Sequence, residues 1–346
     1  ENGMVVSTSR QASIAGIEIL KKGGNAVDAA CATGFVLAVT SSSNGNVGGG
    51  GFMVVHKADS TVFTLDYREI APAVAHRDMF LDSNGEVIDN MSLRTRAASG
   101  VPGSVDGLLK AWKDHGSGNI SRRELLASAI ALAERGFELS HYEARRFNDN
   151  KNLFLNNKAA AKIFIRRDRK PWEAGDRFIQ KDLARTLKRI AREGRDGFYT
   201  GKTADLIIAE MKRGIGLITH EDLLNYESKY RDPMIGSFNG YDIISMGLPS
   251  SGGTILIEML NMLEKFSLAE LGWNSSDYIH LLTEVERRAY ADRAEHLGDV
   301  DFWTPPLSML TSKKYAIDRM DDFYADKATS STVVFAGDPS GYESPE

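Results

Sequence analysis

Residues 46–56, "NVGGGGFMVVH", place four consecutive glycines directly before an apolar run, and residues 60–72, "STVFTLDYREIAP", follow after a short polar stretch. The runs 52–57 and 62–67 are rich in β-branched and aromatic residues, which predicts two strands joined by a turn at residues 58–60. Glycines before a strand indicate a close approach of another backbone or unusual φ values. The stretch therefore predicts a tightly packed strand pair.

Helical periodicity dominates the rest of the chain. Residues 9–22 carry apolar side chains at helical spacing and end at Gly23-Gly24, and Asn25 caps a second helix that reaches about Val39. This second helix has almost no polar face, which predicts burial on all sides. A hairpin with a type I′ turn is predicted at Asn239-Gly240. Further helices are expected near residues 104–114, 122–136, 141–152, 180–193, 202–213, 252–265, 277–297 and 307–320.

The predicted elements are not separated into blocks. No repeat and no low-complexity linker divides residues 1–334, which favours one interwoven α/β domain. Residues 335–346, "FAGDPSGYESPE", are rich in Gly, Pro, Ser and acidic side chains and are typical of an exposed linker.

Composition excludes several classes of protein. The net charge of −5 over 346 residues gives no basic field for nucleic acid, and the longest apolar run, residues 29–39, is too short to cross a bilayer. The single cysteine, Cys31, lies within that run, so we interpret it as a small buried hydrophobe. The chain begins at Glu1 in place of Met, which we interpret as a sign that a leader or tag was removed.

Motifs for cofactors and metals are incomplete. Gly201-Lys202-Thr203 lacks the phosphate-loop glycine, because Asp196 stands at that position, and the glycine run has Met53 where a dinucleotide fingerprint needs its last glycine. The seven histidines are scattered and no second thiol is present, so we expect neither a metal nor a cofactor.

A nucleophile with its base is also missing from these residues. No G-x-S-x-G elbow occurs. Residues 284–299, "EVERRAYADRAEHLGD", pair Glu284 with Arg288 and Arg288 with Asp292 at i,i+4, which predicts a solvated or interfacial ladder of ion pairs. A large α/β chain without a catalytic group of its own suggests one part of an enzyme whose nucleophile lies elsewhere.

Several blocks together resemble the γ-glutamyltranspeptidases. "GMVVSTSRQASIAGIEILKKGGNAVDAACA", "NVGGGGFMVVH", "LDYREIAP", "AASGVPGSVDGL", "ITHEDLLNY", "PSSGGT" and "EVERRAYADRAEHLGD" occur in the order and spacing typical of that family, from about residue 3 to residue 315. The resemblance implies the N-terminal nucleophile hydrolase fold, an αββα sandwich completed by a separate small subunit. This chain would be the helix-rich large subunit.

The resemblance also implies an activity. Family members are made as precursors that cut themselves before a threonine, so Glu346 would be the autoprocessing junction and the catalytic threonine would begin the small subunit. The enzyme would cleave the γ-glutamyl amide of glutathione and related compounds and transfer the acyl group to water or to an amino acid or peptide. The partner would be the small subunit in a heterodimer, without a cofactor, in the bacterial periplasm or outside the cell.

Site residues follow from the matching motifs. In "LDYREIAP" the family position that binds the α-carboxylate of the γ-glutamyl group is Arg68, whose planar fork suits a carboxylate. Without the resemblance, Arg68 would be interpreted as an ion-pair partner of Asp66 and Glu69. Ser250 and Ser251 are candidates for lining the cleft. The residues expected to hold the helical layer together are Arg287, Asp292 and Arg293.

Two kinds of alternative stay open. A related acylase, either a cephalosporin acylase or a poly-γ-glutamate processing enzyme, would share the fold. A non-catalytic binding protein would instead capture an acidic ligand with Arg68 in a glycine-lined cleft. The intact "DYREIAP" favours a free glutamyl α-carboxylate and hence the transpeptidase. One departure is Leu248, which stands where the family usually has proline.

Overall fold

The computed structural model describes residues 3–338 and 341–342, and these form two compact units that are interleaved along the sequence. Unit 1 lies within Glu1–Gly51 and Asp66–Lys229, and unit 2 within Phe52–Leu65 and Tyr230–Glu346. The expected single domain over residues 1–334 stays a prediction. Glu346, the expected junction, lies outside the described residues.

Unit 1 is mainly helical. Ser9 and Asn25 cap its first two helices, each with a side-chain oxygen that accepts from a backbone N–H of the first turn. The cap at Asn25 was predicted, whereas Ser9 was expected to be the first residue of the helix itself. Its elements are α1 Arg10–Lys21, α2 Ala26–Thr40, α3 Met91–Arg94, η1 Arg96–Ala98, α4 Ser104–His115, α5 Arg122–Arg135, β3 Phe137–Glu138, α6 His141–Asp149, α7 Lys151–Leu155, α8 Lys158–Phe164, β4 Arg177–Phe178, α9 Lys181–Glu193, α10 Asp196–Tyr199, α11 Gly201–Met211 and α12 His220–Asn225.

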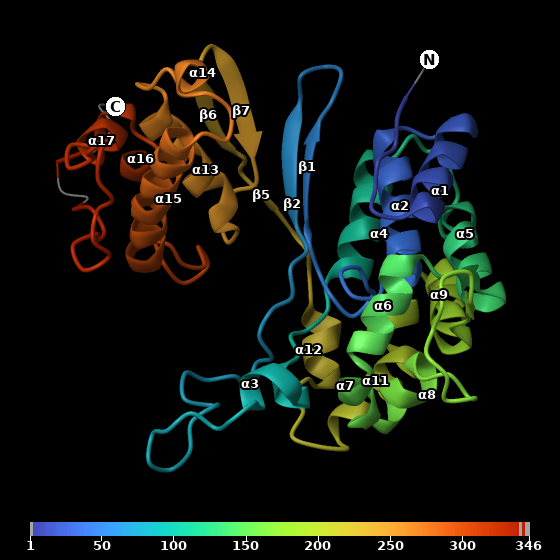
Figure 1. Ribbon diagram of the computed structural model, residues 1–346. Coiled ribbons are helices and arrows are strands. Elements are labelled where there is room, and N and C mark those ends of the chain that lie inside the picture. The colour runs from blue at the N-terminus through green and yellow to red at the C-terminus, as the bar shows by residue number, and fades with distance from the viewer. Residues whose placement is uncertain (1–2, 339–340, 343–346) are drawn as a thin grey trace. The chain divides into compact units, whose positions relative to one another are not determined.

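The core of unit 1 is built around α2, which packs against α1, α4 and α5 (Figure 1). Phe35, Val36 and Val39 are fully buried, but Ala26 and Ala30 are exposed, so the prediction of a helix buried on all sides is wrong for one face. Cys31 is buried as well, as expected. Burial, together with the nearby Asp28 carboxylate, raises the pKa of its thiol to about 12, so Cys31 stays a neutral packing residue.

The predicted strand pair is present as β1 Phe52–His56 and β2 Val62–Asp66 (Figure 1). A third strand, β5 Lys229–Arg231, was not predicted from the sequence. It pairs with the edge of β2 opposite β1, which gives the strand order β1-β2-β5. The Thr64 hydroxyl donates a hydrogen bond of 2.6 Å to the Arg231 carbonyl. β2 begins in unit 2 and ends, at Asp66, in unit 1.

Unit 2 contains the predicted hairpin, in which Asn239 and Gly240 both have positive φ, as a type I′ turn requires. One expected helix, 307–320, is instead two, because the Ser312 side chain caps a new helix after a break. The elements of unit 2 besides those of the three-stranded sheet are β6 Met234–Phe238, β7 Tyr241–Ser245, α13 Ser251–Leu263, α14 Leu268–Leu271, α15 Ser276–His296, α16 Leu307–Leu310 and α17 Lys313–Asp318.

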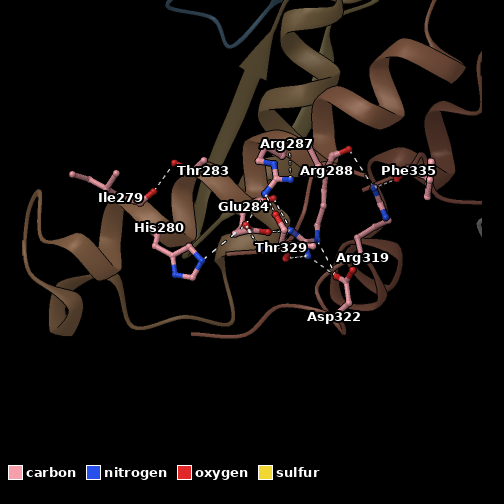
Figure 2. A network of polar contacts seen from close by, with 11 residues as sticks. Ile279, His280, Thr283, Glu284, Arg287, Arg288, Arg319, Asp322, Thr329 and Phe335 are labelled. Atoms are coloured by element: carbon pink, nitrogen blue, oxygen red, sulfur yellow. Dashed lines mark hydrogen bonds and ion pairs between the residues drawn. The ribbon is translucent and has the colours of Figure 1, made fainter. Parts of the chain in front are cut away.

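The ion pairs of α15 are buried, so of the two predicted alternatives, a solvated or an interfacial ladder, the solvated one is wrong (Figure 2). The Glu284–Arg288 pair is confirmed at 2.6 Å, but both side chains are only 1% exposed. Arg288 pairs further with Asp322, and Asp292 pairs with Arg319 at 2.9 Å, so the predicted Arg288–Asp292 pair is wrong. The pairing differs from the prediction because folding brings Asp322 and Arg319, which are distant in sequence, onto this face of α15.

Within the part of the chain that the structure describes, no helix has both the length and the apolarity needed to span a membrane.

Candidate substrate-binding site

Arg68 lies two residues beyond the end of β2, on an exposed turn of unit 1. Its backbone N–H donates a hydrogen bond of 3.0 Å to Asp66 Oδ1, a local turn that directs the chain out of the strand. The neighbouring acid therefore organises the backbone at Arg68. The pattern D-x-R in the sequence is the local signal for this backbone contact.

The glycine run packs against one side of this turn. Gly51 and Tyr67 exchange two backbone hydrogen bonds, of 3.2 and 3.0 Å. A Cβ on Gly50 would lie 2.8 Å from the Arg68 Cα and 2.7 Å from the Glu69 N, closer than any real side chain tolerates. Glycine is required at position 50 because the two backbones touch.

A second backbone approach supports the glycine run itself. The Gly49 carbonyl accepts hydrogen bonds of 2.8 and 2.9 Å from the backbone N–H groups of Gly103 and Ser104 at the start of α4. Ile70 and Val101 form a further bridge, with backbone bonds of 3.3 and 2.8 Å. The main chain on both sides of Arg68 is thus fixed by hydrogen bonds to distant segments.

Tyr226 holds the turn from another side. Its phenol donates a hydrogen bond of 2.9 Å to the Arg68 carbonyl, and its ring stacks on Tyr199, with centroids 5.7 Å apart. Burial, reinforced by nearby carboxylates such as Asp106, raises the pKa of the Tyr226 phenol. Tyr226 therefore remains a neutral hydrogen-bond donor.

A buried polar network holds Tyr226 in place. Asp106 accepts from Arg195 Nε at 2.8 Å and from the Ser228 hydroxyl at 2.6 Å. Arg195 also donates to the Tyr226 carbonyl, and its guanidinium lies over the Tyr199 ring at 4.5 Å. Sequence reasoning missed this network, because Asp106 and Arg195 are 89 positions apart.

The other predicted site residues, Ser250 and Ser251, belong to unit 2. Ser250 occupies the N-cap position of α13, and the Ser251 hydroxyl accepts a hydrogen bond of 3.0 Å from Arg293 Nε. Arg293 thus joins α15 to the first turn of α13, consistent with the structural role expected for it. That these serines line the same cleft as Arg68 stays a prediction.

No set of three or more His, Cys, Asp or Glu side chains suited to a metal ion occurs among the described residues.

The fold and site define a helix-rich α/β chain that presents one arginine on a glycine-supported turn. It belongs to the γ-glutamyltranspeptidase family, whose model matches residues 12–345. The glutathione hydrolase proenzyme of Escherichia coli (strain K12) is 40% identical over 344 residues, which are 99% of this chain and 59% of that protein. The chain therefore spans less than two thirds of that relative's length.

Other proteins that are similar to this chain support the same family assignment. The crystal structure of Helicobacter pylori γ-glutamyltranspeptidase superposes with a TM-score of 0.94 at 42% identity, covering 97% of this chain and 96% of the matched chain. The Acylase ACY 1 proenzyme of Pseudomonas sp. (strain SE83) is 36% identical over 97% of this chain and 61% of that protein. The predicted family and the α/β class of the fold are thus confirmed.

Proposed function

We propose that this chain is the large-subunit part of a γ-glutamyltransferase that also acts as a glutathione hydrolase. It would cleave the γ-glutamyl amide of glutathione and related compounds and pass the acyl group to water or to amino acid and peptide acceptors. Family membership and the name of the Escherichia coli relative support this reaction class. The observation that carries the proposal is the exposed Arg68, whose backbone is held by Asp66, Tyr226 and the glycine run.

Arg68 would bind the α-carboxylate of the γ-glutamyl group. A guanidinium presents parallel N–H donors that match the two carboxylate oxygens, and such charge-assisted bonds are about twice as strong as neutral ones. The fixed backbone means that little main-chain entropy is lost when substrate binds. The γ-carbonyl would then lie at a set distance from the anchored carboxylate.

The catalytic group would come from the small subunit. A precursor would cut itself before a threonine, and the exposed threonine would use its own α-amino group as the base that activates its hydroxyl. That hydroxyl would attack the γ-carbonyl to form an acyl-enzyme, while backbone N–H groups stabilise the oxyanion. The proenzyme names of the relatives support self-processing. The same names favour a heterodimer, and the bacterial sources of these relatives favour the periplasm or the outside of the cell.

The experiment that tests this function is expression of the full precursor, followed by intact-mass and N-terminal analysis and an assay with a γ-glutamyl anilide. We expect two polypeptides in equal amounts, the smaller beginning with threonine, together with release of the aniline. A folded, uncut chain without turnover would reject the enzyme and favour the protein that only binds an acidic ligand.

A second candidate is an acylase, favoured by the likeness to the Pseudomonas acylase. The two are separated by assaying the same preparation with a γ-glutamyl anilide and with a β-lactam side-chain amide. Because Arg68 suits a free α-carboxylate, we expect the γ-glutamyl compound to be used faster. Preference for the β-lactam amide would assign the acylase instead.

A further inference from the structure

Unit 1 contains a cavity of about 600 Å³ that adjoins the residues holding the Arg68 turn. Its walls come from α4, the first residue of α5, the loop between α9 and α10, and the end of α12 with the residues that follow it. Arg195 and Tyr226 both line this cavity. Small-molecule sites in proteins occupy about 300–1,000 Å³, so the space is sufficient for a small metabolite.

Two ion pairs account for part of the charge around this cavity. Arg195 pairs with Asp106 at 2.8 Å, and Lys110 pairs with Asp114 at 3.1 Å. Each pair joins one cation to one carboxylate, so neither adds net charge. The electrostatic character of the cavity therefore depends on the charged side chains that remain.

The other charged side chains that line the cavity are Lys113, Arg122 and Glu227. Lys113 and Glu227 are exposed, and their side chains make no hydrogen bond or ion pair within the part of the chain that the structure describes. Arg122 donates hydrogen bonds of 3.0 and 2.6 Å to the carbonyls of Ala191 and Arg192, and no carboxylate among the described residues pairs with it. Two positive charges and one negative charge are thus open to a ligand.

These remaining charges indicate the chemical class of the ligand. Two cations and one carboxylate are matched by a molecule with two carboxylates and one ammonium group, because opposite charges across an interface attract and like charges repel. Leu109 and Trp112 add apolar surface for a short aliphatic chain. An amino acid with an acidic side chain has this combination of groups.

We propose that this cavity is a second binding site, specific for an acidic amino acid, and that its occupant is glutamate. The charge pattern carries the class of ligand, whereas the choice of glutamate rests on the proposed function, in which glutamate is the product of hydrolysis. Arg195 donates to the Tyr226 carbonyl, and the Tyr226 phenol donates to the Arg68 carbonyl. Glutamate in the cavity would thus lie against the support of the substrate-binding turn without occupying the Arg68 guanidinium.

The test follows Trp112 by fluorine NMR in the full protein labelled with 5-fluorotryptophan. The Trp112 resonance is assigned with Trp112→Phe and recorded as glutamate is added. We expect a saturable shift, and the same shift in Arg68→Lys, because the substrate contact is not part of the cavity. Glutamine and glutarate each lack one of the matching charged groups, so both should require higher concentrations than glutamate.

Two exposed charges of the cavity are suited to substitution, because their side chains make no polar contact with the described residues. Lys113→Gln should raise the half-saturating concentration of glutamate by about two- to fivefold, which is the value of one exposed ion pair. Glu227→Gln should remove the preference for glutamate over glutarate. The matched controls are Lys202→Gln and Glu221→Gln, at exposed positions outside the cavity.

A saturable shift that Lys113→Gln weakens and both controls preserve would support the site. The proposal is overturned if Trp112 does not respond to glutamate, if sodium chloride at equal ionic strength gives the same response, or if Lys113→Gln responds like the wild type. Loss of the response in Arg68→Lys would place glutamate at the substrate contact and also reject a second site.

Release of aniline from a γ-glutamyl anilide, measured on the same preparation, tests the proposed function independently. Turnover without a response of Trp112 would reject only the second site. A response of Trp112 without turnover would reject the proposed function and support the site.

Discussion

The phenol of Tyr226 donates a hydrogen bond of 2.9 Å to the backbone carbonyl of Arg68, 158 positions earlier in the chain. The side chain that we assign to substrate binding is therefore positioned through its own main chain. Because Tyr226 binds the carbonyl of Arg68, the turn that carries this side chain is held in place.

Tyr226→Phe removes that hydrogen bond and keeps the ring stacked on Tyr199. We expect a loss of about 1 kcal/mol in the free energy of unfolding, the usual value of one such bond, and a raised KM for a γ-glutamyl anilide. Urea unfolding and steady-state kinetics measure both. Tyr241→Phe, at an exposed tyrosine, is the matched control. An unchanged KM would mean that the bond does not position Arg68.

Arg68→Lys keeps the charge and removes the planar fork. Loss of a bidentate contact to a carboxylate costs about 1.5–3 kcal/mol, so kcat/KM for a γ-glutamyl anilide should fall by about one to two orders of magnitude. The unfolding temperature should stay the same, because the side chain is exposed. Arg77→Lys, at another exposed arginine, controls for the substitution itself. Wild-type kinetics in Arg68→Lys would refute the assigned role.

Gly50→Ala places a Cβ against the backbone of Arg68 and Glu69. Overpacking of this kind costs about 1–3 kcal/mol, and here the strain is relieved only by moving the binding turn. We expect lower stability together with a several-fold rise in KM. Gly48→Ala serves as the control from the same run, because its Cβ would meet only the flexible Asn46 side chain, at 3.3 Å. Equal effects of the two substitutions would contradict the proposed contact.

Glu258 provides a test by pH. Burial, with the hydrogen bond and charge of Asp292, raises the pKa of Glu258 from 4.5 to about 10. Between these values the folded protein keeps a proton that the unfolded chain releases, so this group makes stability fall as pH rises, by at most about 1.4 kcal/mol per pH unit.

Glu258→Gln carries no such proton and keeps a donor that can face Asp292. We therefore expect the variant to gain in unfolding temperature over the wild type as pH increases from 5 to 9. Thermal unfolding across that range gives the difference directly. Glu270→Gln, at an exposed glutamate, should show no such trend. A difference that stays constant with pH would show that Glu258 is ionised in the folded protein.

Local features of this fold could be predicted from the sequence, and long-range ones could not. The cap at Asn25 and the turn at Asn239-Gly240 depend on neighbours a few positions away, and both were correctly placed. The partners of Arg288 illustrate the limit. Glu284 followed from helical spacing, but Asp322 is 34 positions away and is brought close only by folding.

The residues of the candidate site also fall into those that local sequence predicted and those that it did not. Arg68 was found because its motif is contiguous, and the glycine run beside it was identified as a place of close backbone approach. Tyr226, Asp106 and Arg195 were missed, since no spacing links them to residue 68. Nothing in the local sequence distinguishes a tyrosine that supports a distant carbonyl from one that fills a core.

The turn that carries Arg68 is held by hydrogen bonds from its backbone and by the packing of Gly50 against it. Position 68 is thereby suited to protein engineering, because its side chain can be exchanged while those supports remain. Selection of variants at this one codon, with substrates whose α-carboxylate is replaced by an amide or an ester, offers a direct route to new donor specificities on an unchanged scaffold.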